Sequence, residues 1–200
     1  MPLDLLLSRC FGCDLPYIHS VKFQPFRPGD VIARLEGLTV GPKAYSSVQC
    51  GTGNSDHVEL NSDLLYSALC PPTTHHYSPL PVNHSCEPNV VVDVSSSDRR
   101  KWHVRAVKDI HVGDPVCFFY PSTEWDMEQP FDCICGTRVT PAQSLSHRLP
   151  GTQACLKTIK GARYLSREEL GRRNFINQHI WTMAQERDDK GRNSSIKAKL

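Results

Sequence analysis

Residues 83–89 read Asn-His-Ser-Cys-Glu-Pro-Asn and concentrate chemically capable side chains in one short segment. Asn, Ser and Pro favour turns, so one interpretation of the segment is a polar turn. The order that follows favours a functional site instead. A glycine turn leads into an apolar strand that ends in Tyr120, and residues 131–136 then carry Cys133 and Cys135.

Nine cysteines are many for a chain of 200 residues. The N-terminus has no basic segment ahead of its short apolar stretch, and Asp4 interrupts that stretch. We therefore expect no secretion signal and an intracellular protein, in the nucleus or the cytoplasm. Inside the cell an odd cysteine count favours metal or thiol chemistry over a disulfide framework. Cys10 and Cys13 form a C-x-x-C without a partner pair nearby, and we interpret them as ordinary thiols.

The composition excludes two classes of protein. The chain is 39% hydrophobic and 22% charged, as expected of one soluble globular domain with at most a small appendix. No run approaches the roughly 18 apolar residues that a membrane-spanning helix needs. Lys and Arg exceed Asp and Glu by only 23 to 21, so we expect no membrane role and no direct sequence-specific binding of nucleic acid.

Short strands must position these side chains. Alternating and β-branched residues predict a β-hairpin or meander over 21–40 and a second hairpin from 90–94 and 102–107. An apolar strand is expected at 116–120. Ser166 with Glu169 is a capping box, which predicts helices only near the end of the chain.

This order of motifs resembles the SET-domain protein lysine methyltransferases that carry a cysteine-rich post-SET tail. Residues 83–89 match the N-H-S-C-x-P-N of that family without a mismatch. Residues 113–120 keep the glycine, one acidic residue and the tyrosine of its G-E-E-L-T-x-x-Y motif. The resemblance runs from about 21 to 161. The early G-x-G motif, which helps to cradle the cofactor in the family, has no clear counterpart here.

The resemblance implies a mainly β, SET-type fold of small curved β-sheets with short C-terminal helices. It also implies a knot-like crossing, in which the segment of Tyr120 threads beneath a loop near Asn83 and His84. True knots are rare in proteins, which makes this a demanding prediction. The expected organisation is an N-terminal segment (1–20), a SET-like domain (21–125), a post-SET-like zinc segment (126–162), a helical extension (163–187) and a disordered tail (188–200).

The activity implied by the resemblance is methyl transfer from S-adenosylmethionine to a lysine amine of a protein substrate, histone or non-histone. Tyr120 would be the catalytic residue, and Asn83, His84 and Phe131 would contact the cofactor. Phe131 and Trp125 would line the lysine channel or the adenine pocket, with core packing as the alternative. We expect a monomer. A second hypothesis is a catalytically inactive, zinc-containing SET-like binding module, which the missing G-x-G motif favours.

The family also binds one structural zinc ion through a C-x-C-x4-C motif and the cysteine of N-H-S-C. The corresponding residues here are Cys86, Cys133, Cys135 and Cys155, with unliganded thiols as the alternative. Cys155 follows Cys135 by twenty positions where the family has five, because residues 139–153 are inserted. A second aperiodic insertion occupies 67–81. Our hypothesis is that both stretches are retained introns read in frame, and otherwise they are surface loops; sequencing transcripts across both regions distinguishes the two.

Overall fold

Short strands in small sheets dominate the chain, and helices come only at its end. The computed structural model describes residues 25–35, 37–44, 47–60, 82–111, 114–137 and 154–197. The expectation of a mainly β chain is confirmed. The elements are β1 (Val31–Arg34), β2 (Val40–Gly41), β3 (Ser47–Gln49), β4 (His57–Glu59), β5 (Asn83–His84), β6 (Val90–Asp93), η1 (Arg99–Lys101), β7 (His103–Ala106), β8 (Cys117–Phe118), η2 (Tyr120–Ser122), β9 (Phe131–Asp132), β10 (Thr158–Ile159), η3 (Ala162–Tyr164), α3 (Arg167–Gly171) and α4 (Gln178–Lys197).

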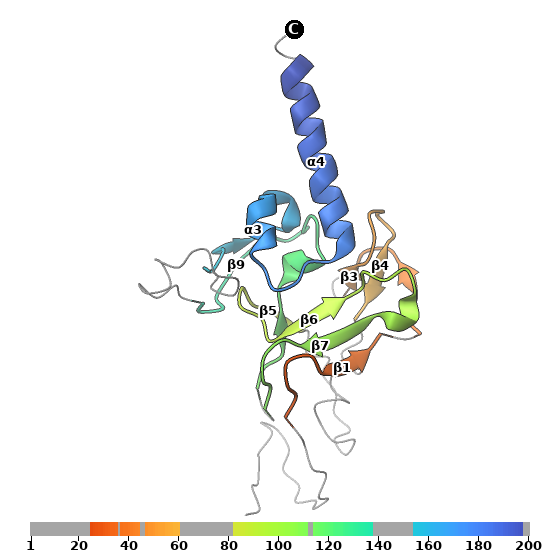
Figure 1. Cartoon of the computed structure of the whole chain (residues 1–200), viewed down its shortest axis with the longest axis vertical. Coiled ribbons are helices and arrows are strands. Elements are labelled where there is room, and N and C mark those ends of the chain that lie inside the picture. The colour runs from red at the N-terminus through yellow and green to blue at the C-terminus, as the bar shows by residue number, and fades with distance from the viewer. Residues whose placement is uncertain are drawn as a thin grey trace, which may run out of the picture.

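The central sheet has the strand order β1-β7-β6, and all its pairs are antiparallel (Figure 1). Strands β6 and β7 form the hairpin expected between residues 90 and 107, joined through η1. Val90, Val92 and Val104 are fully buried on it. A second sheet, β2-β4-β3, packs its Val58 into the same core. The β-branched residues that predict these strands are therefore also the residues that exclude water from the sheets.

The hairpin or meander expected over 21–40 is wrong for the described part of that segment. Strand β1 pairs with β7 and β2 pairs with β4, so β1 and β2 do not pair with each other. The expected turn ahead of β1 is present, because Asp30 accepts a hydrogen bond from the Arg27 backbone N–H at 2.7 Å. The chain before the turn forms a bridge with Ile110 through Phe26, which carries it away from β1. A turn motif fixes a change of direction but does not fix which strands pair.

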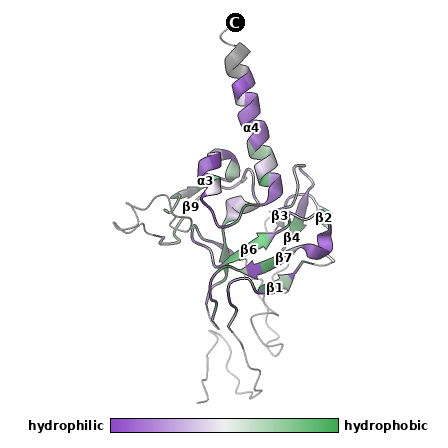
Figure 2. Ribbon diagram, viewed as in Figure 1, coloured by the Kyte–Doolittle hydropathy of each residue, from purple (hydrophilic) through white to green (hydrophobic). Residues whose placement is uncertain are grey.

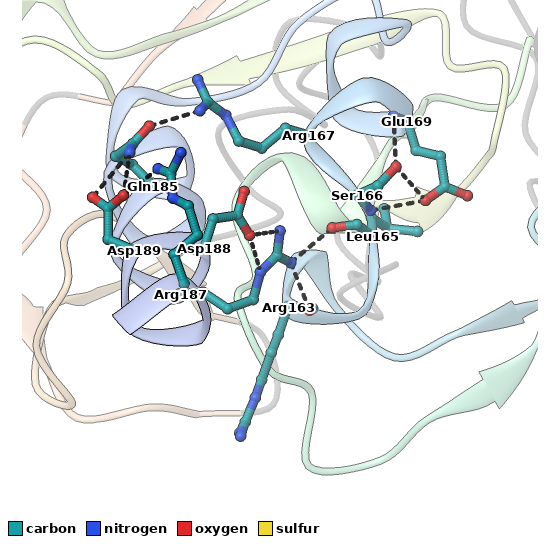
Figure 3. Close-up of polar contacts among 10 residues, drawn as sticks. Arg163, Leu165, Ser166, Arg167, Glu169, Gln185, Arg187, Asp188 and Asp189 are labelled. Atoms are coloured by element: carbon teal, nitrogen blue, oxygen red, sulfur yellow. Dashed lines mark hydrogen bonds and ion pairs between the residues drawn. The ribbon is translucent and has the colours of Figure 1, made fainter. Parts of the chain in front are cut away.

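The C-terminal part forms a second core. The predicted capping box is confirmed, since the Ser166 hydroxyl accepts from the Glu169 N–H and Glu169 accepts from the Ser166 N–H. Leu170 and Ile180 are fully buried there with Phe119, the residue before η2. Figure 3 shows the polar side of this packing, where Arg187 of α4 donates to the Leu165 carbonyl at 2.8 Å. The extension is thus packed against the segment that carries Tyr120.

Helix α4 is longer than expected. We expected a disordered tail from residue 188, but the helix continues to Lys197, so that prediction is wrong for 188–197. Contacts at helical spacing support the continuation, because Asp189 accepts from Gln185 (Figure 3). Asp189 also accepts from Arg192. Beyond its first turns the helix is hydrophilic and rises away from the sheets (Figures 1 and 2). Low hydrophobicity predicted disorder there. The helix continues although Asp, Gly, Asn and Ser are weak helix formers, and contacts at i,i+3 and i,i+4 spacing support it.

Several expectations lie outside the described residues. These are the N-terminal segment 1–20 with Cys10 and Cys13, the two insertions 67–81 and 139–153, and the last residues 198–200. No helix in the described ranges is long and apolar enough to cross a membrane.

Candidate functional site

The segment 83–89 and the strand before Tyr120 lie side by side. Strand β5 pairs in parallel with β8, with Asn83 opposite Cys117 and His84 opposite Phe118. The Ser85 N–H extends this ladder by donating to the Phe118 carbonyl at 3.0 Å. The expected meeting of the two motifs is therefore present. The threading of one segment beneath a loop stays a prediction.

Asn89 clamps the strand that leads into this site. Its side-chain oxygen accepts from the Cys117 N–H and its side-chain nitrogen donates to the Pro115 carbonyl, each at 2.9 Å. An amide group can serve a backbone donor and a backbone acceptor at the same time. The last residue of the segment 83–89 therefore fixes the geometry of the strand that leads to Tyr120.

Tyr120 stands in an aromatic cluster. Its ring centroid lies 4.8 Å from that of Phe118, 5.3 Å from that of His84 and 6.0 Å from that of Phe131. The Tyr120 hydroxyl donates to the Val82 carbonyl at 2.8 Å. Three of the residues predicted for catalysis and cofactor contact thus gather in one place. Asn83, the fourth, is exposed next to them on β5.

His84 links Tyr120 to a cysteine. The backbone N–H of Tyr120 donates to His84 Nδ1 at 3.3 Å, and His84 Nε2 lies 3.4 Å from the sulfur of Cys86. A backbone N–H can only donate, so Nδ1 is the acceptor and Nε2 carries the proton that points at the sulfur. Burial, helped by the nearby charge of Arg173, lowers the pKa of His84 to about 4. The ring is therefore neutral at physiological pH.

The four predicted metal ligands lie together. The sulfur atoms of Cys86, Cys133, Cys135 and Cys155 are all within 4.8 Å of one another. Strands β9 and β10 bring them there, because the pair Asp132 and Thr158 holds the chain before Cys133 beside the chain after Cys155. Antiparallel pairing therefore brings Cys155 close to Cys135, although twenty positions separate the two residues in the chain.

The donor set fits a zinc ion. Four thiolates at a Zn–S distance of about 2.3 Å form a tetrahedron with edges of about 3.8 Å. The sulfurs of Cys86 and Cys133 are 3.8 Å apart, and so are those of Cys135 and Cys155. The Leu156 N–H donates to the Cys86 sulfur at 3.3 Å, which supports a thiolate there. The sulfur–sulfur distances, the soft thiolate ligands and the N–H donor to Cys86 thus all agree with a zinc site.

The thiols differ in how readily they ionise. Burial raises the pKa of Cys86 above its usual range and that of Cys133 to about 11. Burial also opposes ionisation of Cys135, but hydrogen bonds, chiefly from Thr137, lower its pKa to about 6. A metal ion would have to deprotonate Cys86 and Cys133 on binding, whereas Cys135 would be ready at neutral pH.

Trp125 lies at a different place. With Gln49, His57 and Met183 it lines a cleft of about 560 Å³ that none of the aromatic cluster around Tyr120 borders. Its backbone N–H donates to Gln49, and Arg187 lies 5.7 Å from its ring centroid. The two aromatic residues suggested for the lysine channel or the adenine pocket therefore lie in different places. Phe131 joins the cluster and Trp125 does not.

Comparison with known proteins identifies the fold family. The SET domain model matches residues 23–121, a span that includes residues 83–89 and Tyr120. The chain is also 34% identical over 169 residues to "Methyltransferase flvH" of Aspergillus flavus, which covers 82% of this chain and 74% of that protein. The chain belongs to the SET domain family. No solved structure matches it significantly.

Membership of the SET family and similarity to a methyltransferase support methyl transfer as the general reaction. SET methyltransferases use S-adenosylmethionine. The matched span ends at residue 121, so three of the four clustered cysteines come after it. The small sheets expected of a SET-type fold are present, and the two-stranded pairs β5–β8 and β9–β10 hold the site.

Two residues of the site were missed at the sequence level. Arg173 lies over the ring of Phe119 with its Cζ 4.5 Å from the centroid, and it donates to the Cys86 carbonyl at 3.2 Å. Asn177 is fully buried and bonds to β6 and η2. Both come from the connection before α4, where the sequence offers no motif. An Arg and an Asn in a polar connection are ordinary surface residues until the fold places them.

Proposed function

We propose that this chain transfers a methyl group from S-adenosylmethionine to the side-chain amine of a lysine in a protein substrate, histone or non-histone. The observation that carries the proposal is the placement of Tyr120. Its ring stands beside His84 and Phe131, and its hydroxyl is fixed on the Val82 carbonyl. Asn83, His84 and Phe131 are the residues that we assign to the cofactor.

The cofactor supplies a methyl group on a positively charged sulfur, which the amine lone pair displaces as the N–C bond forms and the C–S bond breaks. Such a reaction requires alignment of the three reacting atoms more than a strong base. The Tyr120 hydroxyl donates its hydrogen bond to the Val82 carbonyl, so the lone pairs of its oxygen can accept an N–H of the incoming amine. Accepting that N–H turns the nitrogen lone pair toward the methyl group.

The surroundings of Tyr120 help the amine to arrive uncharged. Phe118, Phe131 and the neutral ring of His84 surround Tyr120 with largely apolar groups, from which a bound substrate and cofactor would displace water. Removal of water lowers the pKa of an amine because the ammonium form loses its hydration. Both ring nitrogens of His84 are engaged within the chain, so His84 would meet the cofactor through its ring face or its backbone.

We also propose that Cys86, Cys133, Cys135 and Cys155 hold one structural zinc ion. Four protein ligands leave no open position for substrate, so the ion would stabilise the fold without taking part in the reaction. It would tie residues 83–89, the strand β9 and the chain after β10 into one unit. Phe131 lies on β9, so the ion would also fix one wall of the cofactor site.

The test is to measure binding of S-adenosylmethionine by calorimetry and transfer of a labelled methyl group to lysine peptides, including a histone tail. We expect Tyr120→Phe to bind the cofactor as the unmodified chain does and to lose about 100-fold in transfer. Tyr164→Phe is the matched control, because Tyr164 of η3 is 57% exposed and should leave transfer unchanged. Absence of cofactor binding would contradict the enzyme and favour the binding module, and unchanged transfer by Tyr120→Phe would contradict the role of Tyr120.

A further inference from the structure

Arg173 connects the C-terminal extension to the cysteine cluster. It lies between α3 and α4, and its Nη1 donates to the carbonyl of Cys86 at 3.2 Å. Its guanidinium also covers the ring of Phe119, which precedes Tyr120, at 4.5 Å. The side chain is thus held by contacts on two sides and stands next to a metal ligand. A guanidinium can stack on a ring and donate hydrogen bonds in its plane at the same time.

The charges near Arg173 make this position significant. Four thiolates and one Zn²⁺ carry a net charge of about −2, and one of the four ligands, Cys86, is fully buried. A buried net charge is unfavourable unless an opposite charge lies nearby. Arg173 carries a permanent positive charge, and the acidic groups near it are Cys86, Glu169, Cys155 and Cys135. Three of these four groups are proposed metal ligands.

We propose that Arg173 is the partly buried counter-charge of the four-cysteine zinc centre, so that the C-terminal extension determines how firmly the chain holds its metal. This inference rests on the proposed zinc site. It assigns a positioning role to a residue 52 positions beyond the end of the SET domain match, which stops at residue 121. Through Phe119 and Cys86 the same side chain would keep the metal centre in register with the segment of Tyr120.

The test compares zinc release from the full-length chain and its variants to a coloured chelator. Arg173→Gln keeps a donor for the Cys86 carbonyl but removes the charge, and Arg173→Lys keeps the charge. Loss of an outer contact to a metal ligand typically weakens metal affinity 10-fold to 100-fold. We expect zinc affinity to fall by about that factor in Arg173→Gln and by less than about 3-fold in Arg173→Lys. The control is Arg167→Met, because Arg167 is an exposed arginine of α3 that bonds to Gln185 and should leave zinc affinity unchanged.

The outcomes separate this inference from the zinc site itself. Equal affinity in Arg173→Gln and the unmodified chain would overturn the counter-charge, and so would equal losses in the Gln and Lys variants. Absence of zinc from the unmodified chain would instead refute the metal site. Circular dichroism of the metal-loaded variants shows whether each one is folded. If Arg173→Gln does not fold, the ratio of the zinc affinities of Arg173→Lys and Arg167→Met still tests the role. A loss of zinc affinity of about 100-fold in Arg173→Lys would contradict the counter-charge, because that variant keeps the charge.

Discussion

Asn177 offers the sharpest test of how the extension is joined to the sheets. Its side-chain oxygen accepts from the Val94 N–H at 2.8 Å, and its side-chain nitrogen donates to the carbonyls of Val92 and Ser122, each at 2.9 Å. The oxygen also accepts from the Ser95 hydroxyl. One buried amide therefore joins β6, the turn after Tyr120 and the start of α4.

Replacement of Asn177 by Ala would leave two buried backbone groups without a partner, the Val94 N–H and the Val92 carbonyl. The other two partners keep alternatives, since the Ser122 carbonyl still accepts from the backbone N–H of residue 177 and Ser95 is exposed. An unsatisfied buried polar group costs about 1–3 kcal/mol. We therefore expect the free energy of unfolding to fall by about 3–5 kcal/mol. That is a large part of the 5–15 kcal/mol typical of a folded domain.

The assay is urea unfolding followed by circular dichroism, with the free energy extrapolated to water. Asn174→Ala is the matched control, because Asn174 is an exposed asparagine three residues earlier and should change stability by less than about 0.5 kcal/mol. Asn177→Asp provides a second comparison. This variant keeps an acceptor for the Val94 N–H but loses the two side-chain N–H donors of Asn177. Near pH 7 it should therefore be at least as destabilised as Asn177→Ala. A loss below about 1 kcal/mol in Asn177→Ala, with an unchanged urea dependence, would refute the reasoning.

Two further predictions concern metal and pH. Cys135→Ser should reduce bound zinc below one ion per chain and lower the melting temperature. Ile134→Ser is the control, because Ile134 is 96% exposed between two of the proposed ligands and should change neither quantity. Equal zinc content in the two variants would contradict the zinc site. Burial lowers the pKa of His179 below its usual 6.5, so its neutral form contributes stability above pH 6.5 that is lost as the pH falls. His179→Gln can still donate to the Thr123 carbonyl and should reduce the pH dependence of stability below pH 6.5 by up to about 1.4 kcal/mol per pH unit, as measured by urea unfolding; an unchanged dependence contradicts this.

The sequence by itself pointed to the family of this protein, because residues 83–89 and the segment that ends in Tyr120 follow the order of the SET domain motifs. The roles predicted for Tyr120 and for the four cysteines came from that resemblance. The hairpin of 90–107 and the capping box at Ser166 were also predictable. Each depends on residues close in the chain, where hydrophobic alternation or one side-chain oxygen decides the local structure.

Only the tertiary structure decided what is joined to what. The pairing of β1 with β7 and of β9 with β10 depends on backbone groups far apart in the chain, and a turn motif does not specify them. The pairing of β9 with β10 brings Cys155 to the other cysteines across a spacing that departs from the family. The roles of Arg173 and Asn177 appear only when burial removes water from their partners, because an exposed arginine or asparagine would bond to water equally well.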